Sequence, residues 1–177
     1  MNYLGIDKSS ISNGPGVRVV LWVSGCSLHC KGCQNPESWD FCAGKLFNET
    51  AKQELFNALD KQYVRGITLS GGHPLEYENL PEIYDLTKEI KEKYPNKNIW
   101  LYTGYVLSIS DFDQSVDIGW DNSLLRNYIL AMCDVVVDGP YIEEQRDITL
   151  AFCGSKNQRI IDVKKTLEQG KIITIQN

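Results

Sequence analysis

The chain has 177 residues, of which 42% are hydrophobic and 23% are charged, and its formal net charge at pH 7 is −5. Because nucleic-acid binding relies on clustered Lys and Arg, this acidic balance argues against nucleic acid as a partner. No apolar run reaches the roughly 20 residues needed to cross a membrane, and Met1–Asp7 lacks the basic start of a signal peptide. We therefore expect a single cytoplasmic domain over residues 1–177, with no membrane partner.

Apolar runs that predict strands recur along the chain. The first, Val17–Ser24, is almost continuously apolar, which is typical of a strand covered on both faces. Three further runs predict strands of the same kind, and two C-terminal runs are weaker candidates. The strong runs are 67–70, 99–103 and 135–138, and the weaker ones are 159–163 and 171–175.

Helix patterns lie between these runs. Thr50–Gln53 reads as a capping box that is followed by an apolar stripe over residues 55–59. A second pattern covers residues 83–90 and stops before Pro95, and a third covers residues 124–129. Strands that alternate with helices predict an α/β fold with a mostly parallel sheet.

Each of the four strong strands ends in a small or polar residue that is followed by glycine. Glycine can simply break a strand. However, parallel α/β folds bind ligands at the carboxyl ends of their strands, where glycine lets backbone amides approach a ligand. Four such positions therefore predict a shared active-site rim. The pairs are Ser24-Gly25, Ser70-Gly71, Thr103-Gly104 and Asp138-Gly139.

Three of the six cysteines lie close together after the first strand. Cys26, Cys30 and Cys33 have the spacing Cys-x3-Cys-x2-Cys. Crowded cysteines in a reducing compartment indicate metal or cluster ligation rather than disulfides. Three thiolates can hold three irons of a [4Fe-4S] cubane and leave the fourth iron open to an exogenous ligand. The alternative is zinc bound by the same cysteines with His29 or Cys42.

The remaining cysteines and tryptophans have simpler interpretations. The other cysteines have no ligand spacing with one another, which favours buried free thiols over a second cluster. Trp22 and Trp100 lie in strands and are expected in the core, whereas Trp39 follows the cysteine loop and could shield a cluster. The three remaining cysteines are Cys42, Cys133 and Cys153.

The cysteine motif after the first strand of an α/β chain resembles the radical S-adenosylmethionine (SAM) superfamily. Further segments resemble the glycyl-radical activating enzymes of that superfamily, in particular those that act on anaerobic ribonucleoside-triphosphate reductase. These segments are 13–16, 70–75, 100–105, 137–139 and 154–159, and the similarity spans residues 1–162. The resemblance implies an incomplete (β/α) barrel with a mostly parallel sheet open on one side, since a complete barrel needs about 250 residues.

The resemblance also implies an activity. One electron from a flavodoxin- or ferredoxin-like donor would reach the [4Fe-4S] cluster and cleave SAM to methionine and a 5′-deoxyadenosyl radical. That radical would take a hydrogen atom from a glycine of the reductase, and no side chain needs to act as a general base. Other radical SAM enzymes share the cysteine motif, among them pyruvate formate-lyase activating types and small deazapurine-forming enzymes. A non-enzymatic electron carrier and a zinc-binding module are further alternatives.

By this resemblance, Cys26, Cys30 and Cys33 hold the cluster, and four segments contribute contacts to SAM. The segments are the cysteine loop, the glycine motif, two strand ends and a late turn, which could alternatively dock the partner. The expected contacts are Gly32, Gln34, Ser70, Gly71, Gly72, His73, Thr103, Asp138, Asn157, Gln158 and Arg159.

Two of these residues depart from the family pattern. Gln34 replaces an aromatic residue that packs near the adenine, although its backbone could still contact the adenine. His73 replaces an acidic residue that continues the glycine motif. We therefore expect His73→Asp to preserve or improve SAM cleavage.

Overall fold

The computed structural model describes residues 1–114 and 122–175, and within them the strands form one seven-stranded sheet in the order β3-β1-β2-β4-β5-β6-β7. The strands are β1 (Asn2–Ser10), β2 (Val17–Val23), β3 (Lys45–Leu46), β4 (Val64–Gly71), β5 (Asn98–Tyr102), β6 (Val135–Asp138) and β7 (Arg159–Asp162). The helices are α1 (Glu49–Leu59), α2 (Leu80–Lys93), α3 (Asn122–Met132) and α4 (Val163–Gln169). Short 3-10 turns occur at Pro36–Ser38, Ile109–Phe112 and Glu143–Gln145.

The centre of the sheet is parallel and its two sides are antiparallel. Strands β2, β4, β5 and β6 pair in parallel, which confirms the predicted α/β fold. Strand β1 runs antiparallel to β2, β3 runs antiparallel to β1, and β7 runs antiparallel to β6. The sheet is therefore mixed, with β3 and β7 as its edge strands.

The predicted elements differ from the observed ones mainly at the two ends of the chain. Strand β1 was not predicted, because its second half is polar and its side chains are largely exposed. The weaker candidate 159–163 corresponds to β7, with α4 beginning at Val163. The other weak candidate, 171–175, is wrong as a strand, since it contributes only an isolated bridge between Thr174 and Ile161.

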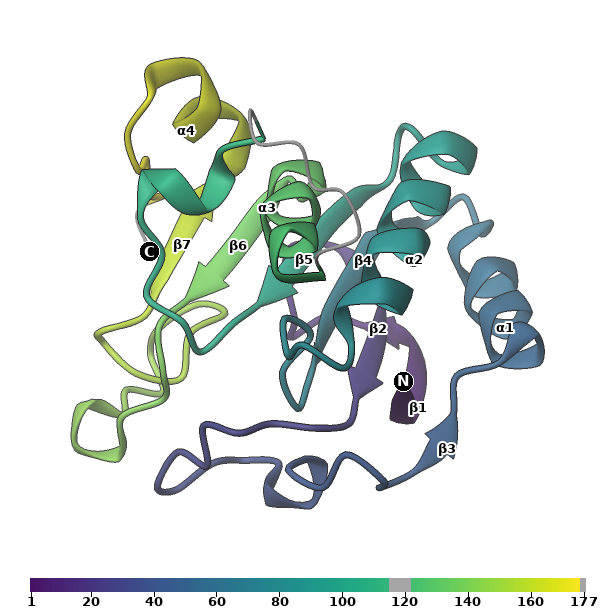
Figure 1. Cartoon of the computed structure of the whole chain (residues 1–177), viewed down its shortest axis with the longest axis horizontal. Helices are drawn as coiled ribbons and strands as arrows, with labels where there is room; N and C mark the ends of the chain where they lie inside the picture. The colour runs from purple at the N-terminus through teal and green to yellow at the C-terminus, as the bar shows by residue number, and fades with distance from the viewer. Residues whose placement is uncertain (115–121, 176–177) are drawn as a thin grey trace.

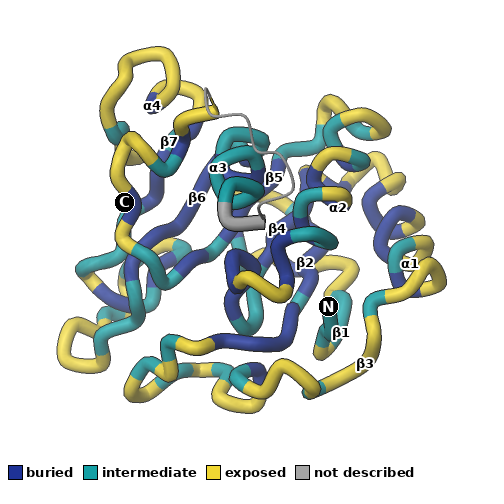
Figure 2. The backbone as a smooth tube through the Cα atoms, in the orientation of Figure 1, coloured by how far each residue is buried: buried dark blue, intermediate teal, exposed yellow. Residues whose placement is uncertain are grey.

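Side chains of the central strands alternate between two apolar layers, because successive residues of a strand point to opposite faces. On β6, Val136 packs in the layer shared with the helices, whereas Val135 and Val137 pack in the opposite layer. Figure 1 shows α1, α2 and α3 on one face of the sheet. Residues of the segment 150–153 pack against the other layer. In Figure 2 the central strands are buried along most of their length.

The helices begin and end close to the predicted positions. The side chain of Asn48 caps α1 by accepting a hydrogen bond from the backbone N of Ala51 at 3.1 Å, so the predicted capping box at Thr50–Gln53 is wrong. Asparagine caps helices about as well as serine, and it precedes the predicted cap by two residues. Helix α2 ends at Lys93, before Pro95, as predicted. In the part of the chain that the structure describes, no helix is long and apolar enough to cross a membrane.

Strand β2 carries an arginine that is fully buried. Arg18 has 0% exposure and donates hydrogen bonds to Thr68 Oγ1 (2.8 Å), Asn98 Oδ1 (2.6 Å) and the carbonyl oxygen of Ile67. Its guanidinium also lies 5.4 Å from the centre of the Trp100 ring. Burial lowers the pKa of Arg18 to about 10. Arg18 lies on the face of the sheet opposite the helices, where neutral oxygen atoms accept the hydrogen bonds of its guanidinium.

The carboxyl ends of the four central strands meet at one edge of the sheet. Their register places Val23 beside Gly71, Leu69 beside Leu101, and Tyr102 beside Val137. In Figure 1 the arrows of β2, β5 and β6 point to the side of the molecule where the segment after β2 runs. The four strand-end glycines therefore lie at one rim, as the sequence predicts.

Candidate functional site

A hollow of about 220 Å³ lies at this rim, and all three cysteines of the motif line it. Its lining comes from the cysteine loop, the four strand ends, and the segments before β2 and β7. The residues are Asn13, Trp22, Cys26, Leu28, Cys30, Cys33, Gln34, Asn35, Ser70, Gly71, Gly72, His73, Tyr102, Thr103, Gly104, Gly139, Tyr141, Gly154 and Gln158.

The cysteine loop is tied to the chain that follows it. The backbone N of Gly25 donates to the carbonyl of Ser38 at 2.8 Å, and that of Cys26 donates to the carbonyl of Trp39 at 3.1 Å. The residues after the last cysteine thus return to the end of β2 and close the loop. Within the loop, the backbone N of Cys33 donates to the carbonyl of Cys30 at 3.1 Å, which makes a tight turn between the two thiols.

The three thiols differ in exposure but all are free. Cys26 is buried, whereas Cys30 and Cys33 are half-buried. Burial raises the pKa of the Cys26 thiol. The ring of His29 stacks on Trp39 with 4.7 Å between ring centres, so Trp39 covers one side of the loop.

The donor set fits a cubane cluster better than a single ion. Within residues 1–114 and 122–175, no three His, Cys, Asp or Glu side chains converge on one metal ion. Zinc requires such convergence, whereas each cysteine of a cubane binds a different iron. Beside the loop, the indole Nε1 of Trp39 is buried and makes no hydrogen bond to the described residues.

The glycine motif after β4 packs directly against the cysteine loop. The backbone N of Gly72 donates to the carbonyl of Val23 at 2.8 Å, and that of His73 donates to the carbonyl of Gly25 at 2.8 Å. A Cβ on Gly72 would lie 2.6 Å from the Gly25 carbonyl oxygen and 2.8 Å from that of Ser38. Only glycine fits such a close approach of two backbones, so Gly72 lets the motif and the cysteine loop share one wall.

The side chain of His73 is buried between two polar partners. The residue is 1% exposed, and its Nε2 lies 2.7 Å from Thr103 Oγ1 while its Nδ1 lies 3.1 Å from Glu76 Oε1. The ring also packs edge-on against Tyr105, with 4.3 Å between ring centres. His73 is therefore a fixed part of the rim rather than a loose loop residue.

Glu76 supplies a carboxylate that was not predicted from the sequence. Its Oε1 also accepts hydrogen bonds from the backbone N (2.9 Å) and hydroxyl (2.8 Å) of Ser27 in the cysteine loop. Burial raises the pKa of Glu76, but the hydrogen bonds from His73 and Ser27 outweigh it and lower the pKa to about 2. The site thus keeps an ionised carboxylate three residues after the histidine.

This carboxylate predicts the effect of His73→Asp on stability. An aspartate at this position would place a second carboxylate beside buried Glu76, and like charges in one site oppose each other. We expect His73→Asp to lower the free energy of unfolding by about 2 kcal/mol. Urea unfolding, compared with His73→Asn as the uncharged control, tests this. Equal stability of the two variants would contradict it.

Asp138 and Arg159 bind each other and do not line the hollow. The guanidinium of Arg159 donates to both carboxylate oxygens of Asp138 and to the carbonyl of Leu107. Asp138 also accepts from the backbone N of Leu107 at 2.8 Å. The hydrogen bond with Asp138 raises the pKa of the Arg159 guanidinium. The pair therefore fixes the loop after β5 to the ends of β6 and β7.

The other predicted residues of the late turn hold loops together. Asn157 donates to the carbonyl of Pro140 at 2.7 Å. Gln158 lines the hollow, accepts from the backbone N of Gly154 at 2.8 Å and donates to the carbonyl of Gly139 at 3.1 Å. Gly32 does not line the hollow. It has φ +75° and faces Glu143.

Several residues have roles that differ from the sequence interpretation. Trp22 was expected in the core, but it is half-buried and lines the hollow, whereas Trp100 is buried as expected. Tyr102 was missed. It also lines the hollow and donates to the carbonyl of Phe152 at 2.9 Å. Alternation along β5 places Tyr102 on the face opposite the helices, which the sequence pattern could have indicated.

The cysteines outside the motif differ in burial. Cys133 and Cys153 are buried, as expected, but Cys42 is exposed and its expected burial is wrong. Cys42 lies in the turn before β3, where its backbone N donates to Asp40 Oδ1 at 2.8 Å.

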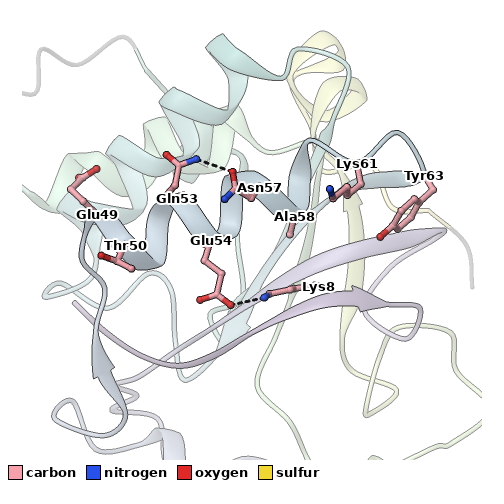
Figure 3. A pocket seen from close by; sticks show the side chains of 9 residues that line it. All are labelled: Lys8, Glu49, Thr50, Gln53, Glu54, Asn57, Ala58, Lys61 and Tyr63. Carbon is pink, nitrogen blue, oxygen red and sulfur yellow. Dashed lines mark hydrogen bonds and ion pairs between the residues drawn. The ribbon is translucent and has the colours of Figure 1, made fainter.

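A larger hollow of about 710 Å³ lies between α1 and β1, shown in Figure 3. Most of the residues that line it have polar or charged side chains, and they include the ion pair of Lys8 with Glu54 at 2.8 Å and the hydrogen bond from Gln53 to Asn57 at 2.9 Å. It contains no cysteine and none of the predicted site residues. The chemistry-bearing side chains therefore select the smaller hollow as the functional site.

Comparison with known proteins gives a consistent result. Residues 12–161 match the family described as 4Fe-4S single cluster domain. An anaerobic ribonucleoside-triphosphate reductase-activating protein of Haemophilus influenzae is 39% identical over 162 residues, which cover 90% of this chain and 97% of the relative. The protein of that name from Enterobacteria phage T4 is 39% identical, over 90% of this chain and 93% of its own. The Escherichia coli K12 protein is 34% identical, over 89% and 96%.

Proposed function

The chain belongs to the family of anaerobic ribonucleoside-triphosphate reductase-activating proteins, and from that premise we propose that it generates a glycyl radical on such a reductase by reductive cleavage of SAM. Membership makes it an activating enzyme with an iron–sulfur cofactor. The observation that carries the SAM part of the proposal is the shared hollow, in which the three free cysteines face the glycine motif and the end of β5.

When bound, the reduced cluster and SAM supply the chemistry: one electron cleaves the S–C5′ bond, giving methionine and a 5′-deoxyadenosyl radical that takes a hydrogen atom from the reductase's glycine. Cys26, Cys30 and Cys33 would hold three irons and leave one open to the amino and carboxylate groups of SAM. The chain itself orients the reactants and excludes water, and no side chain needs to move a proton.

We assign the SAM contacts to predicted residues that line the hollow. The backbone at Gly71 and Gly72 would meet the methionyl amino group, and the backbone of Gln34 would meet the adenine. The full set is Gln34, Ser70, Gly71, Gly72, His73, Thr103 and Gln158. Four predicted residues, Gly32, Asp138, Asn157 and Arg159, would instead hold the loops that frame these contacts, since they do not line the hollow.

The proposal extends to architecture, compartment and electron donor. We propose that residues 1–177 form one radical SAM domain, with the mixed sheet as an incomplete barrel whose open side admits the glycine loop of the reductase. A flavodoxin- or ferredoxin-like protein would supply the electron. The cytoplasm is the proposed compartment because crowded thiols such as Cys26, Cys30 and Cys33 stay reduced in reducing surroundings.

Anaerobic reconstitution with iron and sulfide tests the proposal. The reconstituted protein, reduced with dithionite in the presence of SAM, is expected to release methionine and 5′-deoxyadenosine in equal amounts. Addition of an anaerobic ribonucleoside-triphosphate reductase is expected to produce a glycyl radical that is visible by electron paramagnetic resonance. A protein that binds zinc instead and leaves SAM intact would overturn the proposal. SAM cleavage without a radical on the reductase would point to another radical SAM substrate.

A further inference from the structure

The carboxylate of Glu76 lies behind the glycine motif rather than in the hollow. Only 6% of Glu76 is exposed, and the residue does not line the hollow. Its Oε1 accepts hydrogen bonds from Ser27 N, Ser27 Oγ and His73 Nδ1 at 2.9, 2.8 and 3.1 Å. One oxygen atom therefore connects the cysteine loop to the turn after β4.

These hydrogen bonds define how the His73 ring is oriented. An ionised carboxylate only accepts hydrogen bonds, so Nδ1 of His73 carries the hydrogen directed at Glu76. The opposite nitrogen, Nε2, faces Thr103 Oγ1 at 2.7 Å. Thr103 Oγ1 already accepts from the backbone N of Tyr105 at 3.2 Å, which leaves its hydroxyl hydrogen to point toward Nε2. Glu76 thus sets the ring, and the ring sets the Thr103 hydroxyl.

The backbone of this turn is held by other contacts. The backbone N of His73 donates to the carbonyl of Gly25 at 2.8 Å. The side-chain amide of Asn79 donates to the carbonyls of Ser24 (2.9 Å) and His73 (3.2 Å). A change at Glu76 is therefore expected to release the His73 ring and the Ser27 contacts without unfolding the turn.

We propose that Glu76 is a positioning residue for SAM, acting through His73 while its bonds to Ser27 hold the cysteine loop. His73 and Thr103 line the hollow together with the three cysteines, so their orientation decides which polar groups face SAM. This inference rests on the proposed function. Glu76 also supplies a carboxylate close to His73, the position at which the family motif has an acidic residue.

Glu76→Gln tests the role, because it removes the charge and keeps the size of the side chain. The KM for SAM is expected to rise about tenfold, while kcat for 5′-deoxyadenosine release changes less than about threefold. The matched control is Glu78→Gln, an exposed glutamate two residues further along the same turn. It makes the same charge change and is expected to keep the wild-type KM.

A second readout does not depend on turnover. Charge-assisted hydrogen bonds are about twice as strong as neutral ones, so loss of the charge weakens the bond to the Ser27 amide. Hydrogen exchange followed by mass spectrometry on the reconstituted full chain is expected to show exchange about tenfold faster in a peptide containing Ser27. Peptides from α3 are expected to keep their rates, which separates local release from general destabilisation.

Action through His73 is tested by a double-mutant cycle. If Glu76 acts through the histidine, adding Glu76→Gln to His73→Asn raises the KM for SAM less than about twofold further, because the intermediary is already absent. A full tenfold increase in the His73→Asn background would overturn the proposed route.

The two possible failures are distinguishable. A wild-type protein that releases no 5′-deoxyadenosine would sink the proposed function and this inference with it. A wild-type protein that cleaves SAM, together with Glu76→Gln that matches Glu78→Gln in KM and exchange rates, would overturn the inference alone.

Discussion

Replacing Cys30 with alanine is expected to lower 5′-deoxyadenosine release at least about a hundredfold. Mutating a residue that only supports a metal ligand already lowers metal affinity or activity up to about a hundredfold, and the loss of a ligand itself should have a larger effect. Cys30 is half-buried in the hollow with the other two cysteines of the motif. None of the three cysteines outside the motif lines that hollow, so none of them could replace Cys30. Iron content, visible absorption and product release after anaerobic reconstitution measure the effect.

Cys42→Ala is the matched control for this change. Cys42 is exposed, follows the motif in the chain and does not line the hollow, so its loss is expected to leave iron content and SAM cleavage unchanged. Full iron content and activity in Cys30→Ala would show that this thiol is not a ligand. Loss of the cluster in Cys42→Ala as well would assign this thiol to the site.

Replacing Asp138 with alanine is expected to lower the free energy of unfolding by about 3 kcal/mol, because it leaves the Arg159 cation without its partner. The Asp138 side chain is 1% exposed and that of Arg159 is 35% exposed, so solvent can relieve part of the cost. The substitution also leaves the backbone N of Leu107 without its acceptor. Urea unfolding measures the loss.

The exposed ion pair between Lys31 and Glu144 provides the control for Asp138→Ala. Exposed pairs contribute little to stability, so Glu144→Ala is expected to leave the unfolding midpoint unchanged. The Asp138 variant also distinguishes a structural role from a contact to SAM. Unchanged stability combined with a raised KM for SAM would return Asp138 to the set of SAM contacts.

The sequence was sufficient to place the cysteine motif and the strand ends around it. Three cysteines within eight residues belong to one short segment, so a single loop that turns at the end of the first strand can bring their thiols to one place. Likewise, glycines that end neighbouring parallel strands must share an edge of the sheet. Local spacing alone gives both features, and Cys26, Cys30, Cys33 and Ser70–His73 do line one hollow.

Contacts between distant segments could not be predicted in this way. Glu76 and Ser27 are 49 positions apart, and Asp138 and Arg159 are 21 apart. The residues next to Glu76 and Asp138 in the sequence do not indicate which distant side chains these two carboxylates bind. The same holds for Arg18. Its position in an apolar strand does not reveal that it is buried among polar acceptors from β4 and β5.

The sequence by itself therefore determined the α/β order of elements, the position of the cysteine motif and the family, because strand patterns and short cysteine spacings are encoded in consecutive residues. Only the tertiary structure decided which polar side chains face the hollow and which hold it together. That division depends on strand register and on loops returning to the sheet. It therefore fixes Thr103 in the hollow, Asp138 in an ion pair, and Glu76 behind His73.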